Sequence, residues 1–580
     1  MVLQKNRPMK FTNLGFIVLL ILFAHCQNPA PEIVEGSLPA IMCGAPVSDA
    51  EWYKVNQKAP LLPGLNVLQF PISTTDTLVQ RYFNQGLVLA YGFNHAEAAR
   101  SFYYASKLDT SCAMCYWGFA YVLGPNYNAG MEPDHYSRAY KAIQQALKVA
   151  EKGSSDKELD LIHALAVRYP REAVDDRSPF DIAYAAAMEK LYRKYPGDAD
   201  IGALYAEAMM DLHPWDLWEP SGEPKPWTPE IVQTLEHILQ ISPRHPGAHH
   251  FYIHAVEASQ TPYRGIPSAR LFDEDLVPGS GHLVHMASHI YIRTGDYHLG
   301  TLSNIRAVEV DSSYTTLCHA QGVYPLSYYP HNYHFLTATA TLEGNSHYAI
   351  EGALKMAAYV DKEVMKKPEW STLQHYFIIP YFVYVKLGKW DDILAMPALD
   401  TALFYPQAVR HYARGMAFLG KRDVPAAQKE LAALEISLSD NRLRESTIWG
   451  INSTYDLVQI AYRVLKGELL GREDNFSEAI QILNEAVALE DQLNYNEPPD
   501  WFFSVRHHLG AVQLEAGRPQ DAIATLQEDL KHFPKNGWAL HGLKRAYEQL
   551  GAQDSAKQMQ DLLAEVWASA DISLESSCIR

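Results

Sequence analysis

The chain has 580 residues, of which 48% are hydrophobic, and it carries a formal net charge of −18 with a pI near 5.7. This apolar content is typical of a folded protein and excludes a largely disordered chain. After the first ten residues there is no cluster of lysine and arginine. Because binding to a nucleic-acid backbone needs concentrated positive charge, we expect no nucleic-acid partner.

The first 26 residues have the pattern of an export signal. Lys5, Arg7 and Lys10 form a basic start, and an apolar run follows at residues 14–24. A membrane-spanning helix needs about 20 apolar residues, whereas this shorter run suits the core of a signal peptide. The run leads into Cys26, and the segment resembles a bacterial lipoprotein signal, in which the cysteine is lipidated. We expect an extracytoplasmic protein of the periplasm or cell envelope, with either a lipid anchor at Cys26 or simple cleavage nearby.

The rest of the chain divides by its helical periodicity. Residues 27–75 predict an extended N-terminal segment. Residues 76–245 predict helical repeats that include a connection rich in proline and tryptophan at 213–229. Residues 246–400 predict a histidine-rich central set of repeats, and residues 401–580 a C-terminal set. No alternating strand pattern persists and no glycine-rich phosphate loop occurs, so the predicted class is all-α.

The clearest repeat unit covers residues 501–534. Small residues at fixed places allow the two helices of a hairpin to cross closely, and large apolar residues fill the groove beside them. Its marker residues are Leu509, Gly510, Gly517, Ala522, Leu526 and Pro534.

The same spacing recurs around Gly86, Gly344, Gly415 and Gly467. Over residues 80–565 the chain therefore resembles the tetratricopeptide repeat proteins. The resemblance implies a superhelical array of antiparallel helix pairs, an α-solenoid, whose concave groove binds a peptide, a protein or a small-molecule ligand.

Histidines are concentrated in the central repeats. Twelve of the 24 histidines lie between His245 and His347. Seven of them recur at spacings of three, four or seven residues, which place each group on one helical face. The groups are His250 and His254; His282, His285 and His289; and His331 and His334. In the repeat register these positions face the groove, so we expect three successive first helices to aim histidines into one cavity, with His375 added by the next unit.

These histidines predict a metal site. Neutral imidazole is a common ligand of Zn, Cu and Fe, and catalytic zinc sites typically use three protein ligands. All seven are candidate ligands of such an ion, with His250, His254 and His285 foremost. Glu257 lies one turn after His254 and is a candidate ligand, a candidate partner that orients a ligand, or a candidate general base. The remaining histidines of the region lie off these faces and are interpreted as structural: His245, His249, His298, His319 and His347.

A second interpretation needs no metal. Nearby tyrosines offer hydrogen-bond partners, and a row of histidine and tyrosine can line a groove for a peptide or a sugar. Two functions therefore stay open: an exported binding protein or scaffold, and a metal-dependent hydrolase or oxidoreductase with the histidines as its active site. No Gly-x-Ser-x-Gly elbow supports nucleophilic catalysis instead.

Two smaller features accompany the first repeats. Cys112 and Cys115 form a single CxxC, which can close a disulfide in an oxidising compartment or pack as two small apolar residues. Asn126 and Asn128 follow the same predicted helix and are candidates to cap it or to line the groove.

Overall fold

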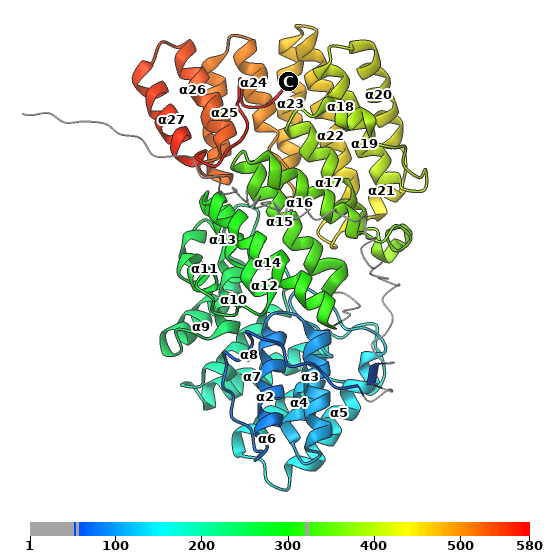
Figure 1. Cartoon of the computed structure of the whole chain (residues 1–580), viewed down its shortest axis with the longest axis vertical. Helices are drawn as coiled ribbons and strands as arrows, with labels where there is room; N and C mark the ends of the chain where they lie inside the picture. Colours follow the sequence, from blue (N-terminus) through cyan, green and yellow to red (C-terminus); the bar gives the residue numbers. More distant parts are fainter. Residues whose placement is uncertain (1–51, 54–56, 319–323) are drawn as a thin grey trace, which may run out of the picture. The chain divides into compact units, whose positions relative to one another are not determined.

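The computed structural model describes residues 52–53, 57–318 and 324–580, with side chains omitted at 316–318. The predicted signal segment, Cys26 and His319 lie outside the described residues. Within them the chain is an array of helices with one two-stranded sheet, which confirms the all-α prediction (Figure 1). Residues 57–75 contain no helix or strand. None of the described helices is both long enough and apolar enough to cross a membrane.

The elements follow one another in three sets. The N-terminal helices are α2 (Thr77–Tyr91), α3 (His95–Leu108), α4 (Ala113–Tyr121), α5 (His135–Ala150), α6 (Asp156–Ala166), α7 (Ser178–Lys194), α8 (Ala199–Met210) and α9 (Thr228–Ile241). The central helices are α10 (Pro246–Glu257), η1 (Pro262–Gly265), α11 (Ile266–Asp273), α12 (Gly281–His285), α13 (Ala287–Thr294), α14 (Tyr297–Cys318), η2 (Tyr324–Tyr328), α15 (Tyr329–Leu342), α16 (Ser346–Tyr359), η3 (Val364–Lys366), η4 (Pro368–Trp370), α17 (Leu373–Lys386) and α18 (Trp390–Ala395). The C-terminal elements are α19 (Phe404–Gly420), α20 (Val424–Ser437), α21 (Arg442–Glu445), β1 (Thr447–Ile448), β2 (Asn452–Ser453), α22 (Thr454–Arg472), α23 (Phe476–Glu490), α24 (Arg506–Glu515), α25 (Pro519–His532), α26 (Gly537–Gln549) and α27 (Gln553–Val566).

Small residues allow these helices to pair. A Cβ atom at Gly86 of α2 would lie 2.8 Å from the ring of Phe102 on α3. A Cβ atom at Gly510 of α24 would lie 2.9 Å from Leu526 on α25. Both contacts join residues that the repeat pattern assigns to opposite helices of one hairpin, so the packing of α2 on α3 and of α24 on α25 confirms the repeat register.

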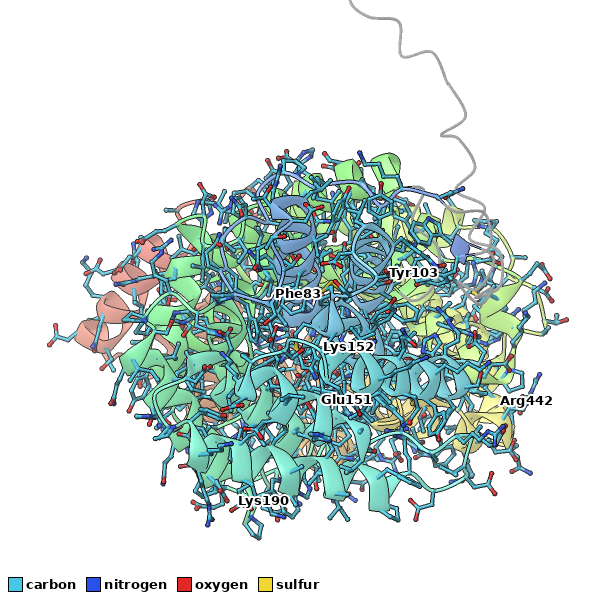
Figure 2. All side chains as sticks on the ribbon, turned by 90° about the horizontal axis from the view of Figure 1, so that it is seen from below. Phe83, Tyr103, Glu151, Lys152, Lys190 and Arg442 are labelled. Atoms are coloured by element: carbon cyan, nitrogen blue, oxygen red, sulfur yellow. A yellow bond between two sulfur atoms is a disulfide. The ribbon has the colours of Figure 1, made fainter. Side chains whose placement is uncertain are left out.

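The buried apolar side chains form two large cores. One core draws on residues 59–328 and the other on residues 292–538. Charged side chains such as Glu151 and Lys190 lie on the outside, whereas Phe83 is fully buried (Figure 2). The N-terminal core also holds a disulfide between Cys112, the N-cap of α4, and Cys115, so of the two alternatives for this CxxC the structure contains the disulfide.

The C-terminal repeats dock on the central ones at the turn between α13 and α14. Gly295 in this turn has a φ of +77°, and a Cβ atom there would lie 2.2 Å from the carbonyl oxygen of Pro534. The Tyr297 hydroxyl donates to the same oxygen (2.8 Å), and Lys535 pairs with Asp296 (2.8 Å). This contact fixes the end of α13, which carries one of the predicted metal ligands.

Gly295→Ala should therefore destabilise the protein more than Gly517→Ala. Both glycines have positive φ, but a Cβ atom at Gly517 meets nothing within 4 Å. The backbone conformation alone should cost about 1 kcal/mol in either variant, and displacing the Pro534 carbonyl should add about 1–3 kcal/mol in Gly295→Ala. Thermal unfolding followed by circular dichroism measures the difference, and equal melting temperatures would show that the docked turn contributes nothing.

Candidate metal centre

Six of the seven predicted ligands form two groups of three buried or half-buried histidines. Within each group the candidate ligand atoms all lie within 4.8 Å of one another. We call them triad A and triad B. Triad A consists of His250, His254 and His282; triad B consists of His285, His289 and His331. The seventh predicted ligand, His334, joins neither triad.

Helix α10 supplies two ligands of triad A because of how it begins. Pro246 occupies its first turn, and the Nδ1 atom of His245 accepts the backbone N–H of Ala248 at 3.0 Å. This cap is the structural role expected of His245. It fixes where α10 begins, and the spacing of four residues then places His250 and His254 on the same face.

The next three histidines come from two short helices rather than the single helix that their spacing predicts. Helical bonding is interrupted at Met286, whose φ of −55° and ψ of −26° stay in the right-handed helical region. The N–H of His289 bonds the carbonyl of Met286, three residues back, at 3.3 Å. Because the chain keeps its helical course, the three imidazoles stay together, but they divide between the triads: His282 joins triad A, whereas His285 and His289 join triad B.

Polar groups outside the triads hold the Nδ1 hydrogens of two ligands. His250 Nδ1 lies 2.5 Å from the carbonyl oxygen of Tyr91, the last residue of α2, and a carbonyl can only accept. His285 Nδ1 lies 2.9 Å from Oδ1 of Asn304 on α14. The Asn304 Nδ2 atom donates to the Gly300 carbonyl at 2.8 Å, which turns its oxygen toward the imidazole. Both rings therefore carry their hydrogen on Nδ1 and a lone pair on Nε2.

A single carboxylate holds the Nδ1 hydrogen of one ligand in each triad. Glu257 Oε1 accepts from His254 Nδ1 at 2.8 Å, and Glu257 Oε2 accepts from His289 Nδ1 at 2.5 Å. Burial of Glu257 opposes its ionisation, but His289 and His254 outweigh this effect and lower the pKa of the carboxyl to about 2. Glu257 is thus an anion placed behind the two rings, on the side away from the Nε2 atoms.

The Nε2 atoms converge. In triad B the Nε2 atoms of His285 and His289 are 2.9 Å apart, and in triad A those of His250 and His282 are 3.2 Å apart. Since Asn304 and Glu257 hold the Nδ1 hydrogens in triad B, two lone pairs there face one point. Lone pairs at this distance repel unless a cation or a shared proton lies between them. This arrangement makes the group a candidate cation site.

Burial keeps these rings in their metal-binding form. The pKa values of His250, His282, His285 and His331 are well below 6.5, first because burial disfavours the imidazolium and then because neighbouring histidines repel a charge. Neutral imidazole is the species that binds a metal. One phenylalanine also packs on each triad: Phe93, at a φ of +55°, lies 4.5 Å from the His250 ring, and Phe335 lies 4.3 Å from the His289 ring.

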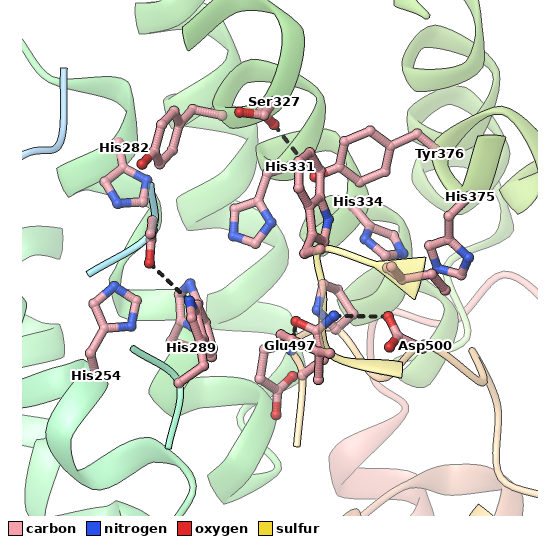
Figure 3. Close-up of a pocket in the computed structure, with 18 residues that line it drawn as sticks. His254, His282, His289, Ser327, His331, His334, His375, Tyr376, Glu497 and Asp500 are labelled. Atoms are coloured by element: carbon pink, nitrogen blue, oxygen red, sulfur yellow. Dashed lines mark hydrogen bonds between the residues drawn. The ribbon is translucent and has the colours of Figure 1, made fainter. Parts of the chain in front are cut away.

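The histidines open onto a cavity of about 150 Å³ (Figure 3). His254, His282, His289 and His331 line one side of it, and His334 and His375 line another. Its walls also include residues that helical periodicity does not reveal. They are Trp215, Tyr328, Tyr376, Ile448, Trp449, Ile451, Glu497, Pro498 and Asp500.

Two residues of the cavity wall were partly indicated by the sequence. Trp215 belongs to the predicted connection at 213–229, and its Nε1 donates to Oδ1 of Asn128 at 3.1 Å. Asn128 lines the cavity, as one of the two alternatives for it predicted. Trp449 is carried by the turn between β1 and β2, which no sequence pattern indicates.

Two of the nearby tyrosines bond carboxylates rather than imidazoles. Tyr252 donates to Glu236 and Tyr291 to Asp273, so neither serves an imidazole. Three of the histidines interpreted as structural lie outside the triads. His249 bonds Ser268, His298 bonds Glu343, and His347 is exposed beside Glu351.

The triads do not lie on an open groove. His250, His285 and His289 are fully buried, because α2 and the C-terminal elements around Trp449 and Glu497 cover the faces that the repeat register directs toward the concave surface. Of the three ligand types predicted for the groove, a small molecule matches the size of the cavity beside the triads.

Neither a model of a known protein family nor a curated protein matches the chain. Three solved structures of tetratricopeptide-type helical proteins are similar to it. The human IFIT1 dimer with m7Gppp-AAAA is 12% identical, with 86% of this chain and 92% of that chain covered and a TM-score of 0.31. The APC/C hetero-tetramer Cut9–Hcn1 is 12% identical (87% and 77% covered, TM-score 0.27), and yeast Tom70 is 14% identical (84% and 93% covered, TM-score 0.26). At these values no ligand or partner transfers to this chain.

Glu497, in the cavity wall, should make stability depend on pH. Burial raises the pKa of this carboxyl to about 8, above the value near 4.5 of an unfolded glutamate. Its stabilising contribution is therefore complete below pH 4.5 and is lost as the pH rises through 8. The free energy of unfolding of the wild type should therefore fall with pH between pH 4.5 and 8. In Glu497→Gln this fall should be smaller by about 1.4 kcal/mol per pH unit. Urea unfolding at several pH values measures it, with the exposed Glu445→Gln as control; an unchanged slope in Glu497→Gln would contradict the assignment.

Proposed function

We propose that this chain is an exported metalloprotein that holds two transition-metal ions, one in each histidine triad, beside a cavity that admits a small molecule. The observation that carries the proposal is that two imidazoles of each triad have their Nδ1 hydrogens held by Tyr91, Asn304 or Glu257, which leaves the Nε2 lone pairs of these rings within the cluster. Outer hydrogen bonds of this kind are the usual support of metal-ligating histidines.

Two ions are favoured over one. Each triad has three imidazoles of its own, which is the number of protein ligands typical of catalytic zinc. Imidazole donors suit Zn, Cu and Fe. Members of both triads line the cavity, so a position on each ion would face a bound molecule. This open position supports a metal-dependent enzyme over a scaffold.

Glu257 orients ligands in this proposal and is not a general base. Both of its oxygens are engaged by imidazoles, and the residue is not part of the cavity lining. A base must reach a proton of the reacting molecule, whereas Glu257 reaches the rings from behind. Its charge also offsets part of the positive charge of two ions.

Export is part of the proposal for a separate reason. The basic start and apolar run of the first 26 residues support it, and so does the disulfide between Cys112 and Cys115, since disulfides persist in oxidising compartments. Whether Cys26 carries a lipid stays a prediction, and so does the expectation that no nucleic acid binds.

Metal analysis of single-triad variants tests the two sites separately. Dialysis against zinc followed by elemental analysis should give two ions per chain in the wild type and one in His254→Ala or His285→Ala, because each variant disrupts one triad. The exposed His347→Ala is the control and should keep two. Wild-type protein without bound zinc, or two ions in both triad variants, would refute the proposal.

The role of Glu257 has its own test. Glu257→Gln should keep both ions at saturation but weaken binding by about 10- to 100-fold, the usual cost of losing an orienting partner. Glu343→Gln is the matched control, because Glu343 is also buried and accepts from a histidine Nδ1, that of His298 (2.9 Å). Isothermal titration with zinc compares the affinities, and equal weakening in both variants would assign the effect to general destabilisation.

A further inference from the structure

The side of the cavity away from the triads is built to hold a ligand of its own. His334 and His375 are 4% and 1% exposed, and their rings lie 5.6 Å apart. Phe502 stacks on the His334 ring at 5.1 Å, and the Nδ1 atom of His375 bonds the Tyr405 hydroxyl at 3.1 Å. Both rings are therefore held firmly, yet their buried Nε2 atoms lack a partner within the protein and line the cavity (Figure 3).

Aromatic rings dominate the walls between this end and the triads. Trp215, Tyr328, Tyr376 and Trp449 line the cavity, together with Ile448, Ile451 and Pro498. Tyr376 and Trp449 rings lie 5.7 Å apart, and Trp449 is 39% exposed, which places it at the entrance. The volume of about 150 Å³ equals that of an engineered cavity known to hold benzene. A single aromatic ring fits both the size and the walls.

The hydrogen-bonding groups of the wall exclude a more polar guest. The carboxylate of Asp500 already accepts from Asn452 and Asn496 at 2.8 and 2.9 Å, and Asn128 accepts from Trp215. Away from the triads, the buried wall atoms of the described chain that lack a partner are the Nε2 atoms of His334 and His375 and Oε2 of Glu497. A sugar ring carries several hydroxyls, each of which loses its hydrogen bonds to water on burial, and three atoms on one side do not replace them.

Charge excludes an anionic guest at this end. The described lining contains no lysine or arginine, and it contains two carboxyl groups. Burial lowers the pKa of His375 to about 3, and that of His334 is well below 6.5 for the same reason and because of His375. Neutral imidazoles and carboxyl groups favour a neutral hydroxyl over a carboxylate or phosphate.

We infer that the cavity binds a monocyclic phenol, with its ring between the aromatic walls and a hydroxyl at the Nε2 atoms of His334 and His375. The inference deepens the proposed function by naming the class of small molecule that lies beside the metal centre. The walls on which it rests lie away from the triads, so metal-free protein should bind the same ring.

The test uses phenol as the probe and the quenching of tryptophan fluorescence as the signal, on the full chain after removal of metal. Phenol should bind saturably. Cyclohexanol, of similar size but without a π-system, should bind roughly three- to tenfold more weakly. Benzoate and glucose should show no saturable binding. Tighter binding of glucose or benzoate than of phenol would overturn the inference.

Two variants locate the site. Trp449→Ala at the entrance removes a wall and should weaken phenol roughly three- to tenfold; His375→Leu removes a hydrogen bond and should weaken it by a similar factor. The exposed Tyr263→Ala is the control and should bind like the wild type. Because Trp449 is partly exposed, its variant tests the site even where His375→Leu does not fold. Isothermal titration replaces fluorescence for Trp449→Ala, and undiminished phenol binding in this variant would overturn the inference.

The same samples separate this inference from the proposed function. Two zinc ions per chain without phenol binding would overturn the phenol site and leave the metal centre standing. Phenol binding by a protein that takes up no zinc would overturn the metal centre and leave the phenol site standing.

Discussion

The centre depends on one carboxylate that bonds two imidazoles from different helices. Glu257 accepts from His254 on its own helix, α10, and from His289 on α13. Burying an anion costs several kcal/mol unless good hydrogen bonds compensate for it. The two helices must therefore meet at a spacing that satisfies both oxygens, and that spacing also brings triads A and B together.

The rest of the fold holds this spacing from outside. The carbonyl at the end of α2 orients His250, and Asn304 of α14 orients His285. Arg293, which follows on α13, donates to the backbone carbonyl of Glu257 at 3.1 Å. The docked turn at Gly295 ties the same helix to the C-terminal repeats. The polar centre contacts both apolar cores, through Phe93 of the first and Phe335 of the second.

Helical periodicity predicted much of this arrangement, because ligands three or four residues apart share a helical face whatever the rest of the fold does. This spacing identified all six triad histidines and Glu257. It did not predict the division into two triads, since this depends on how α10, α12, α13 and α15 cross. It also missed the partners of Nδ1: Tyr91 acts through its backbone, which carries no residue-specific signal, and it lies 159 residues from His250.

The sequence also did not indicate that other elements cover the site. The tetratricopeptide resemblance implies an open groove, but Trp449 and Glu497 reach the cavity from loops whose residues follow no period. These additions cover the surface that the repeat pattern directs outward, so that the triad histidines are buried or half-buried. In the proposed function, this cover would limit the access of water to the two ions and hold a small molecule beside them.

Anomalous diffraction from crystals of zinc-loaded protein, recorded on both sides of the zinc absorption edge, addresses the two-ion centre most directly. We expect two peaks per chain, one in each triad, each about 2.0–2.1 Å from a nitrogen of three imidazoles. A single peak shared by both triads, or no peak at these histidines, would contradict it.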